Sequence, residues 1–373
     1  MRVLITGGAG FIGSHTADAL LRRGDAVRVL DNLQKPVHLK GKPSYLSDEL
    51  EFVFGDVRDR EVLSYALEGV DAVLHLAAYQ DYLPDFSTYF HVNAVSTALI
   101  YELVVERKLP VKRVVVASSQ AVLGEGAYEC SEHGMFCPDI RVEQQLRNAQ
   151  WDHLCPKCAR VLSPIPTPEQ TINPRNQYAL SKHSLEEIAL SLGKRYQIPS
   201  VALRYSIVQG ARQSFYNAYS GAMRIFALSL YFDRPPTIYE DGRQLRDYVN
   251  IRDVVNANLL ALDDPRAAFE AFNVGGGKGY SVREFYAIMQ KVVGKQLDAR
   301  TGGFYRYGDT RHIVSDISKL SALGWEPKVP IEQSVAEYWD YLVAQKNIDN
   351  ILEYADKTMA RLNVVRTAGA GQD

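Results

Sequence analysis

Thr6-Gly-Gly-Ala-Gly-Phe-Ile-Gly13 lies between the apolar run Val3-Leu4-Ile5 and a helical pattern that begins at Ser14. Glycines permit a tight turn and let a ligand approach the backbone closely, and the N–H groups that open a helix bind phosphate oxygens. The G-x-x-G-x-x-G spacing after a strand and before a helix is therefore typical of a loop that binds the pyrophosphate of a dinucleotide.

Short apolar runs and helical patterns alternate on either side of this loop. The runs are apolar throughout, as expected for strands that are covered on both faces. Strands separated by helices predict a parallel sheet with right-handed crossovers, which is a doubly wound α/β fold of the Rossmann type. We expect strands at residues 3–5, 27–30, 52–54, 72–74, 114–116 and 200–203, and helices at residues 14–23, 60–67, 93–107 and 177–196.

The α/β alternation is interrupted between residues 125 and 171. This stretch contains all four cysteines and several prolines, so we expect a Cys-rich insertion. A helix is expected near residues 218–230, and residues after 345 are expected to continue a helix and to end in a frayed tail. The predicted units are a dinucleotide-binding domain (1–124 and 172–208), the insertion (125–171), a smaller α/β substrate subdomain (209–345) and a C-terminal helix and tail (346–373).

The charge balance excludes a strongly basic surface. Lys and Arg total 42 against 44 Asp and Glu, which gives a net charge of −2 and argues against nucleic acid as a partner. No stretch approaches the roughly 20 apolar residues that a membrane span needs, so a membrane partner is not expected either. The first residues lack the pattern of a secretory signal, so we expect a cytoplasmic protein whose cysteines are reduced.

Polar or small residues follow the expected strands. Asp31 ends the second strand, where a carboxylate accepts hydrogen bonds from the adenosine ribose and repels a 2′-phosphate, which favours NAD over NADP. Asp56 follows the third strand and is expected near the adenine amino group. Ala77 and Ala78 follow the fourth strand and are expected to pass close to the cofactor.

Tyr178 and Lys182 are four residues apart at the start of a helix and therefore share a face. A free phenol titrates near pH 10, and a neighbouring ammonium together with a nicotinamide cation favours its ionised form. Such a pair is common on ordinary helix surfaces. Together with the glycine loop, however, it predicts hydride chemistry in which Tyr178 is the acid/base.

With these motifs the chain resembles the extended short-chain dehydrogenases/reductases of the NAD-dependent epimerase/dehydratase type, over about residues 1–330 outside the insertion. Ser118-Ser119, Arg246-Asp-Tyr-Val249 and Asp309-Thr-Arg311 add to the match. The resemblance implies that Ser119 bonds the sugar hydroxyl being oxidised, that Tyr178 takes its proton and that Lys182 holds the nicotinamide ribose. The cofactor contacts that it implies are Gly7, Gly10, Phe11, Ile12, Gly13, Asp31, Asn32, Asp56, Val57, Leu76, Ala77, Ala78, Asn93, Tyr178, Lys182 and Tyr205.

Ser119-Gln120-Ala121 distinguishes between branches of that family. The 4,6-dehydratases carry Thr-Asp-Glu at the corresponding strand end, and those carboxylates serve the elimination of water. Their absence here favours a redox-only reaction such as epimerisation through a 4-keto sugar. A dehydrogenase or reductase that releases NADH or a keto sugar, and a non-catalytic protein that senses NAD, are the alternatives.

Two segments with arginines resemble those that hold the diphosphate of a nucleotide sugar, and a guanidinium suits phosphate because of its planar fork. Relatives that epimerise galactose carry Tyr-Phe-Asn where this chain has Tyr205-Ser-Ile207, and Ile207 lacks the amide. Residues 203–214, residues 217–225 and the insertion instead resemble dTDP-L-rhamnose 4-epimerases, with UDP-sugars as the alternative substrates. The expected substrate contacts are Gln80, Gln120, Asn217, Arg243, Arg246 and Arg311, although a surface salt bridge is an equally good reading of Arg243. Relatives often dimerise through helices that correspond to residues 93–107 and 177–195, so we expect a homodimer.

Cys130-x6-Cys137 and Cys155-Pro-Lys-Cys158 form two pairs. Four thiolates close a tetrahedral zinc site, and such a site folds a segment that has little core of its own. The first pair is more widely spaced than usual, and His133 is a possible substitute for one cysteine. We expect structural zinc, with free thiols and a redox pair as the alternatives.

Overall fold

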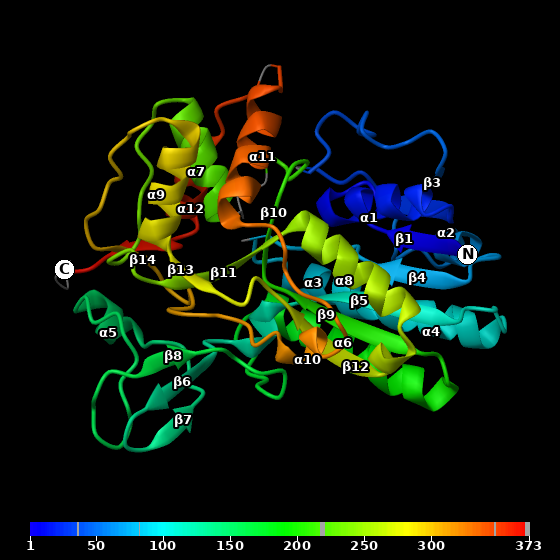
Figure 1. The fold of residues 1–373 in the computed structure, drawn as a ribbon, viewed down its shortest axis with the longest axis horizontal. Coiled ribbons are helices and arrows are strands. Elements are labelled where there is room, and N and C mark those ends of the chain that lie inside the picture. Colours follow the sequence, from blue (N-terminus) through cyan, green and yellow to red (C-terminus); the bar gives the residue numbers. More distant parts are fainter. Residues whose placement is uncertain (36, 82, 217–220, 347, 370–373) are drawn as a thin grey trace.

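The computed structural model describes residues 1–35, 37–81, 83–216, 221–346 and 348–369 (Figure 1). Its centre is a seven-stranded sheet in the order β12-β9-β5-β4-β1-β2-β3, and every pairing within it is parallel. The predicted doubly wound α/β fold is therefore confirmed. The strands are β1 (Arg2–Thr6), β2 (Ala26–Asp31), β3 (Glu51–Phe54), β4 (Ala72–His75), β5 (Arg113–Ser119), β9 (Ser200–Tyr205) and β12 (Glu270–Val274).

Both faces of the sheet are covered, which explains its continuous apolar strands. Val3 and Ile5 of β1 pack in one core with α1 (Phe11–Arg22) and α8 (Ile251–Asp263). Leu4 points to the opposite face, as the two-residue period of a strand requires. That face is covered by α2 (Arg60–Ala66), α6 (Gln177–Tyr196) and the continuous helix formed by α3 (Phe86–Tyr89), a π-helical turn (Phe90–Val95) and α4 (Ser96–Glu106).

The predicted end of the dinucleotide-binding domain at residue 208 is wrong. The chain leaves the sheet after β9 but returns to it through α8 and β12, which pairs with β9 from Glu270 to Val274. A mixed polar and apolar edge strand gives a weaker signal than the central strands do. Short 3-10 turns (Gln120–Leu123 and Pro265–Ala267) and α10 (Ser318–Ser321) complete this part of the molecule.

The substrate subdomain is built on a three-stranded sheet of β10 (Ile207–Gln209), β11 (Leu245–Asn250) and β13 (Gly279–Ser281). Three helices pack around a shared apolar core with this sheet: α7 (Ala222–Tyr231), α9 (Val282–Val293) and α11 (Ile331–Val343). The helix predicted near 218–230 corresponds to α7, and its first residues lie outside the described part of the chain.

The expectation of one continuing helix after residue 345 is wrong for the described residues, whereas most of the tail that was expected to be frayed (residues 370–373) lies outside them. Helix α11 ends at Val343, and a separate helix α12 (Leu352–Arg361) follows. Strand β15 (Val365–Thr367) then pairs antiparallel with β14 (Phe304–Arg306), so this end of the chain folds back onto the substrate subdomain (Figure 1). Among the described residues, no helix combines the length and the apolarity that a bilayer crossing requires.

The Cys-rich insertion has a small sheet of its own, formed by β6 (Ala127–Cys130), β7 (Gly134–Phe136) and β8 (Ser163–Ile165), with the short helix α5 (Glu143–Arg147). Figure 1 shows it beside the substrate subdomain and away from the first strands of the central sheet. Its buried apolar core is very small and consists of Tyr128, Cys130, Cys155 and Leu162.

Candidate active site

A cavity of about 1550 Å³ lies between the carboxyl edge of the central sheet and the substrate subdomain. Ligands bind at this edge in doubly wound sheets because the strand ends and the helix N-termini converge there. Most of the residues predicted to bind cofactor or substrate line this cavity: Gly7, Gly10, Phe11, Ile12, Asp31, Asn32, Asp56, Val57, Leu76, Ala77, Ala78, Gln80, Ser119, Gln120, Tyr178, Tyr205 and Arg246.

The glycine loop is packed so tightly that side chains are excluded from two of its positions. Gly7 has φ +67°, and a Cβ atom there would lie 2.7 Å from the backbone of Ala77. A Cβ atom on Gly13 would lie 2.4 Å from the carbonyl oxygen of Gly7. Gly10 immediately precedes α1, no side chain caps the first N–H groups of the helix, and Gly10, Phe11 and Ile12 line the cavity. This arrangement suits a pyrophosphate.

Two carboxylates follow β2 and β3 beside this loop. Asp31 accepts hydrogen bonds from the backbone N–H groups of Ala9 (3.0 Å) and Leu33 (2.8 Å), which ties the glycine loop to the end of β2. Asp56 accepts two hydrogen bonds from the side chain of Arg58 (2.9 and 2.8 Å), one from its backbone N–H group (2.9 Å) and one from Asn32 (2.9 Å). The hydrogen bonds from Arg58 are the main reason why the pKa of Asp56 is lowered to about 2, so its carboxylate is ionised at neutral pH.

Tyr178 enters the cavity from the first turn of α6, whose start is capped by the side chain of Asn176. Burial raises the pKa of Tyr178 to about 12, and a hydrogen bond with Ser119 opposes this rise. Lys182 lies one turn further along, with its Nζ atom 5.9 Å from the centre of the Tyr178 ring and 2.6 Å from the carbonyl oxygen of Ala117. Burial lowers the pKa of Lys182 to about 7. The three predicted catalytic side chains are therefore brought together, with Lys182 buried behind Tyr178.

Several polar atoms in the cavity wall have no hydrogen-bond partner within the described chain: Gln120 Oε1, Gln213 Oε1, Gln244 Oε1 and the hydroxyl of Tyr248. A buried polar atom without a partner costs about 1–3 kcal/mol, so these atoms are suited to a polar ligand. Of these four residues, only Gln120 was predicted from the sequence as a substrate contact. Gln244 and Tyr248 belong to the segment that also carries Arg246, but the direction of their side chains cannot be read from a sequence.

Other predicted residues do not line the cavity. Gly13 packs beneath the glycine loop, and Arg243 is exposed. Asn93, in the π-helical turn, accepts a hydrogen bond from the N–H group of Tyr79 (2.9 Å) and donates one to Ser181 of α6 (2.9 Å), so it braces the cavity wall from behind. Asn217 lies outside the described residues.

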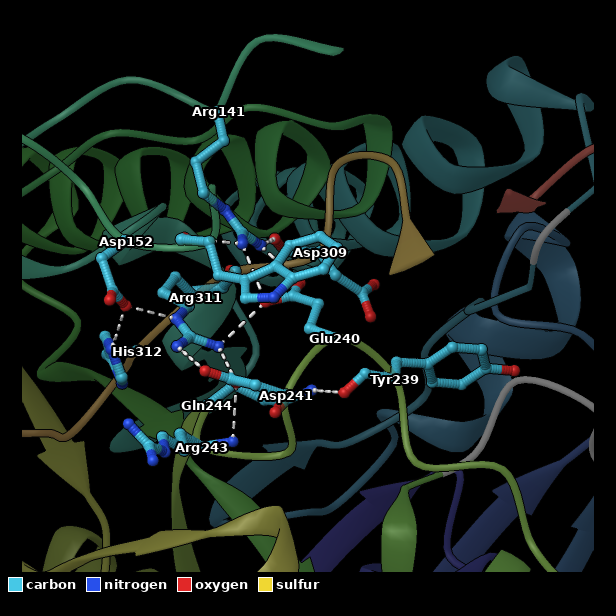
Figure 2. Close-up of polar contacts among 12 residues, drawn as sticks. Arg141, Asp152, Tyr239, Glu240, Asp241, Arg243, Gln244, Asp309, Arg311 and His312 are labelled. Carbon is cyan, nitrogen blue, oxygen red and sulfur yellow. Dashed lines mark hydrogen bonds and ion pairs between the residues drawn. The ribbon is translucent and has the colours of Figure 1, made fainter. Parts of the chain in front are cut away.

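Arg311 is the clearest departure from expectation (Figure 2). Its side chain is only 1% exposed, and its guanidinium donates to Asp152 (2.8 Å), Glu240 (3.0 Å) and both carboxylate oxygens of Asp241 (2.7 and 2.9 Å). Because carboxylates surround it, this guanidinium does not reach a phosphate in the cavity, and the predicted substrate role needs correction. Arg246 does line the cavity.

The metal-ligand prediction also needs one correction. The potential ligand atoms of Cys130, His133, Cys155 and Cys158 all lie within 4.8 Å of one another, whereas Cys137 lies outside this group and 3.9 Å from the hydroxyl of Thr171. Cys137 follows β7, while the Cys130–His133 turn joins β6 to β7. His133, predicted only as a possible substitute for a cysteine, is therefore the fourth member of this group in place of Cys137.

Residues 3–137 and 153–275 match the family described as the NAD-dependent epimerase/dehydratase family. The chain is 29% identical to dTDP-L-rhamnose 4-epimerase of Burkholderia thailandensis, over 94% of this chain and 97% of that protein. It is 31% identical to a putative UDP-glucose 4-epimerase of Methanocaldococcus jannaschii, over 89% of this chain and 95% of that protein.

Solved structures resemble the whole molecule. UDP-glucose 4-epimerase of Thermus thermophilus in complex with NAD is 30% identical and has a TM-score of 0.71, with 93% of this chain and all of that chain covered. UDP-glucose 4-epimerase of Thermotoga maritima with UDP-glucose is 29% identical, has a TM-score of 0.73 and covers 92% of this chain and 99% of its own. Since the glycine loop, Tyr178 and Lys182 lie in the matched segments, this chain belongs to the NAD-dependent epimerase/dehydratase family.

Proposed function

We propose that this protein is an NAD-dependent nucleotide-sugar 4-epimerase that works through a transient 4-keto sugar. The observation that carries the proposal is the meeting of Ser119 and Tyr178 in the cavity that the glycine loop also lines. The cavity volume of about 1550 Å³ exceeds the roughly 300–1,000 Å³ of a single-ligand pocket, which supports binding of a dinucleotide and a nucleotide sugar together.

The residues at the inner end of the cavity fit NAD. The tight glycine loop and the open first turn of α1 suit its pyrophosphate, and the carboxylate of Asp31 suits the hydroxyls of its adenosine ribose. When bound, this cofactor supplies the acceptor and the donor of a hydride, and its positive charge favours an ionised phenol. Tyr178 then takes the proton of the C4 hydroxyl and later returns it, and Ser119 orients that hydroxyl.

The residues after β5 support epimerisation rather than elimination of water. Ser119, Gln120 and Ala121 line the cavity there, and none of them is a carboxylic acid. Glu125 follows in the chain, but its carboxylate already accepts hydrogen bonds from the backbone N–H of Arg311 (2.9 Å) and from His153 (3.0 Å). A site of this kind oxidises and reduces the same carbon without an acid and a base for dehydration.

We propose dTDP-L-rhamnose and dTDP-6-deoxy-L-talose as the substrate pair. Their C5 methyl group suits a partly apolar wall, and Ile207, Val208, Ile225 and Phe226 line the cavity. The resemblance to the Burkholderia enzyme supports this pair, while the similar identity to UDP-glucose 4-epimerases keeps UDP-sugars as the second candidates. Incubation with dTDP-, UDP- and GDP-sugars followed by NMR tests the proposal. A C4-inverted dTDP sugar is expected, whereas steady accumulation of NADH would identify a dehydrogenase instead.

We also propose a structural zinc ion bound by Cys130, His133, Cys155 and Cys158. Tetrahedral bonds of about 2.3 Å to sulfur place two sulfur ligands about 3.8 Å apart. The Cys130 and Cys158 sulfurs are 3.7 Å apart, and His133 Nδ1 lies 3.6 and 3.5 Å from the sulfurs of Cys130 and Cys155. Elemental analysis should find one zinc per chain in the wild type and in Cys137→Ser but much less in Cys158→Ser. Equal zinc in Cys158→Ser and the wild type would refute the proposed ligand set.

We further propose a homodimer formed through α4 and α6. Val95, the last residue of the π-helical turn before α4, and Leu180 in α6 are apolar and exposed, which supports a contact with a second copy on this side of the sheet. Light scattering after gel filtration should give twice the chain mass for the wild type and a lower mass for Leu180→Glu. A wild-type mass equal to one chain would refute the dimer.

A further inference from the structure

Arg141, Asp152, Glu240, Asp241 and Arg311 form a cluster that we call the arginine–carboxylate cluster (Figure 2). It joins three segments that are distant in sequence: the Cys-rich insertion, the loop before β11 and the loop after β14. Arg141 donates to both carboxylate oxygens of Glu240 (2.9 Å each), and Arg311 connects Glu240 and Asp241 to Asp152.

The centre of the cluster is buried, whereas the side chains of Asp152 and Asp241 at its edge are partly exposed. Arg141 is 2% exposed, Glu240 6% and Arg311 1%. Arg141 also donates to the carbonyl oxygens of Trp151 (3.0 Å) and Asp309 (2.7 Å), so one guanidinium holds all three segments. Glu240 has φ +54°, a left-handed conformation that is unfavourable for this residue. Such strain persists only where the surroundings impose it, and it is most frequent at functional sites.

A second set of contacts connects the Cys/His group to the same loops. Tyr128 lies two residues before Cys130 on β6, and its hydroxyl accepts a hydrogen bond from the N–H group of His312 (3.1 Å). The imidazole of His312 in turn accepts one from the N–H group of Leu245 (3.1 Å). His153 lies two residues before Cys155 and contacts Glu125, which accepts the N–H group of Arg311.

The loops held in this way carry the polar wall of the cavity. Arg246 lines the cavity, and its Nη atoms donate to the carbonyl oxygens of Thr310 (2.7 Å) and Arg311 (3.1 Å). Gln244, whose Oε1 atom has no partner within the described chain, lies on the same loop as Glu240. The position of Arg246 therefore depends on the loop that Arg141 and Arg311 anchor.

We propose that the insertion is a positioning element for substrate binding, in which the arginine–carboxylate cluster and the metal-held Cys/His group together place Arg246 against the diphosphate of the nucleotide sugar. Arg141 and Arg311 are positioning residues that touch neither substrate nor cofactor. The inference rests on the proposed function. NAD binding should not depend on this arrangement, because the glycine loop and Asp31 lie at the ends of β1 and β2 in the central sheet and not on the loops that the cluster holds.

Calorimetric titration of the NAD-loaded protein with UDP and with dTDP tests the inference without turnover. Arg141→Met should weaken binding of the nucleotide that the wild type binds at least roughly tenfold, because a displaced guanidinium loses its contact. The matched control is Arg28→Met. Arg28 is a buried arginine that donates to the carbonyl oxygens of Tyr65, Ala66 and Glu68 outside the cavity. The Arg28→Met variant should leave the affinity for the nucleotide within about twofold of the wild-type value.

An affinity of Arg141→Met within about twofold of the wild type, with normal NAD content, would overturn the inference. A wild type that binds neither nucleotide would instead overturn the proposed function. If Arg141→Met is insoluble, Arg141→Lys tests the same point, because lysine keeps the charge but cannot bridge all three segments. Arg141→Lys should also weaken nucleotide binding while NAD content stays normal. In steady-state assays both variants should raise KM far more than they lower kcat.

The contribution of the Cys/His group to the position of Arg246 is tested with two cysteine variants. Cys158→Ser should lose metal and show the same weakening of nucleotide binding as Arg141→Met, while Cys137→Ser should retain metal and wild-type affinity. Loss of metal from Cys158→Ser with unchanged nucleotide affinity would show that the Cys/His group does not position Arg246.

Discussion

Lys182 donates a hydrogen bond of 2.6 Å from its Nζ atom to the carbonyl oxygen of Ala117. Ala117 lies two residues before Ser119 on β5, so this bond ties the reactive turn of α6 to the strand that presents Ser119. The Lys182 side chain is only 1% exposed, and its Nζ atom is thereby held 5.9 Å from the centre of the Tyr178 ring. This geometry leads to separate predictions for Tyr178 and Lys182.

Tyr178→Phe should abolish epimerisation while NAD remains bound, because the substitution removes only the hydroxyl that exchanges the proton. Turnover should fall by at least about 10²-fold, the usual contribution of a positioned acid/base. Turnover assays and NAD content of the purified protein check this. The control is Tyr101→Phe, which removes a buried hydroxyl 2.6 Å from Ser200 and outside the cavity. Substantial turnover by Tyr178→Phe would assign the proton transfer to another group.

Lys182→Met should change the pH dependence of stability. Burial lowers the folded-state pKa of Lys182 from 10.5 to about 7, so the unfolded chain holds this proton more tightly between those values. The contribution of Lys182 to the free energy of unfolding therefore becomes less unfavourable as pH rises from 7 to 10.5, by at most about 1.4 kcal/mol per pH unit. Denaturant unfolding should show the stability advantage of Lys182→Met over the wild type shrinking across this range. A pH-independent difference would contradict the assigned burial.

Asp31→Asn should weaken NAD binding and reduce discrimination against NADP, because it removes the negative charge that repels a 2′-phosphate. The ratio of NADP to NAD affinity should rise by roughly tenfold or more, equivalent to about 1.4 kcal/mol. Asp25→Asn, at the residue before β2 and not among the residues that line the cavity, is the matched control. Unchanged cofactor preference in Asp31→Asn would remove the basis for NAD selectivity at this position.

Gln120→Met should leave the protein as stable as the wild type or more stable, because it removes a buried oxygen that has no partner within the described chain. Substrate binding should weaken by about 1–3 kcal/mol if that oxygen bonds the sugar. Thermal unfolding and KM measurements separate the two effects. A marked loss of stability with unchanged KM would make Gln120 a structural residue.

The parts of the molecule that could be predicted are those with a local signal. The central strands are continuous apolar runs because helices cover both faces, and the glycine loop needs its glycines because a Cβ on Gly7 or Gly13 would overlap the backbone. Edge strand β12 was missed because its pattern is mixed. The C-terminal strand β15 was missed because its partner β14 lies about 60 residues earlier.

The errors within the candidate site have a common physical origin, since each depends on contacts between distant segments. Arg311 was expected at the diphosphate, but Asp152, 159 residues earlier, and Asp241, 70 residues earlier, surround its guanidinium. His133 enters the Cys/His group because the turn between β6 and β7 brings it beside Cys130, while Cys137 continues past the hairpin. Neither outcome is encoded in spacing alone.

The most direct test of the central claim follows the hydrogen at C4. The wild type should convert a nucleotide sugar deuterated at C4, with dTDP-L-rhamnose tried first, into its C4 epimer. Because the hydride returns to the carbon that it left, NMR should show the deuterium retained at C4 in ordinary water. Absence of any C4 epimer across the dTDP-, UDP- and GDP-sugars, or replacement of the deuterium by solvent hydrogen, would contradict the account.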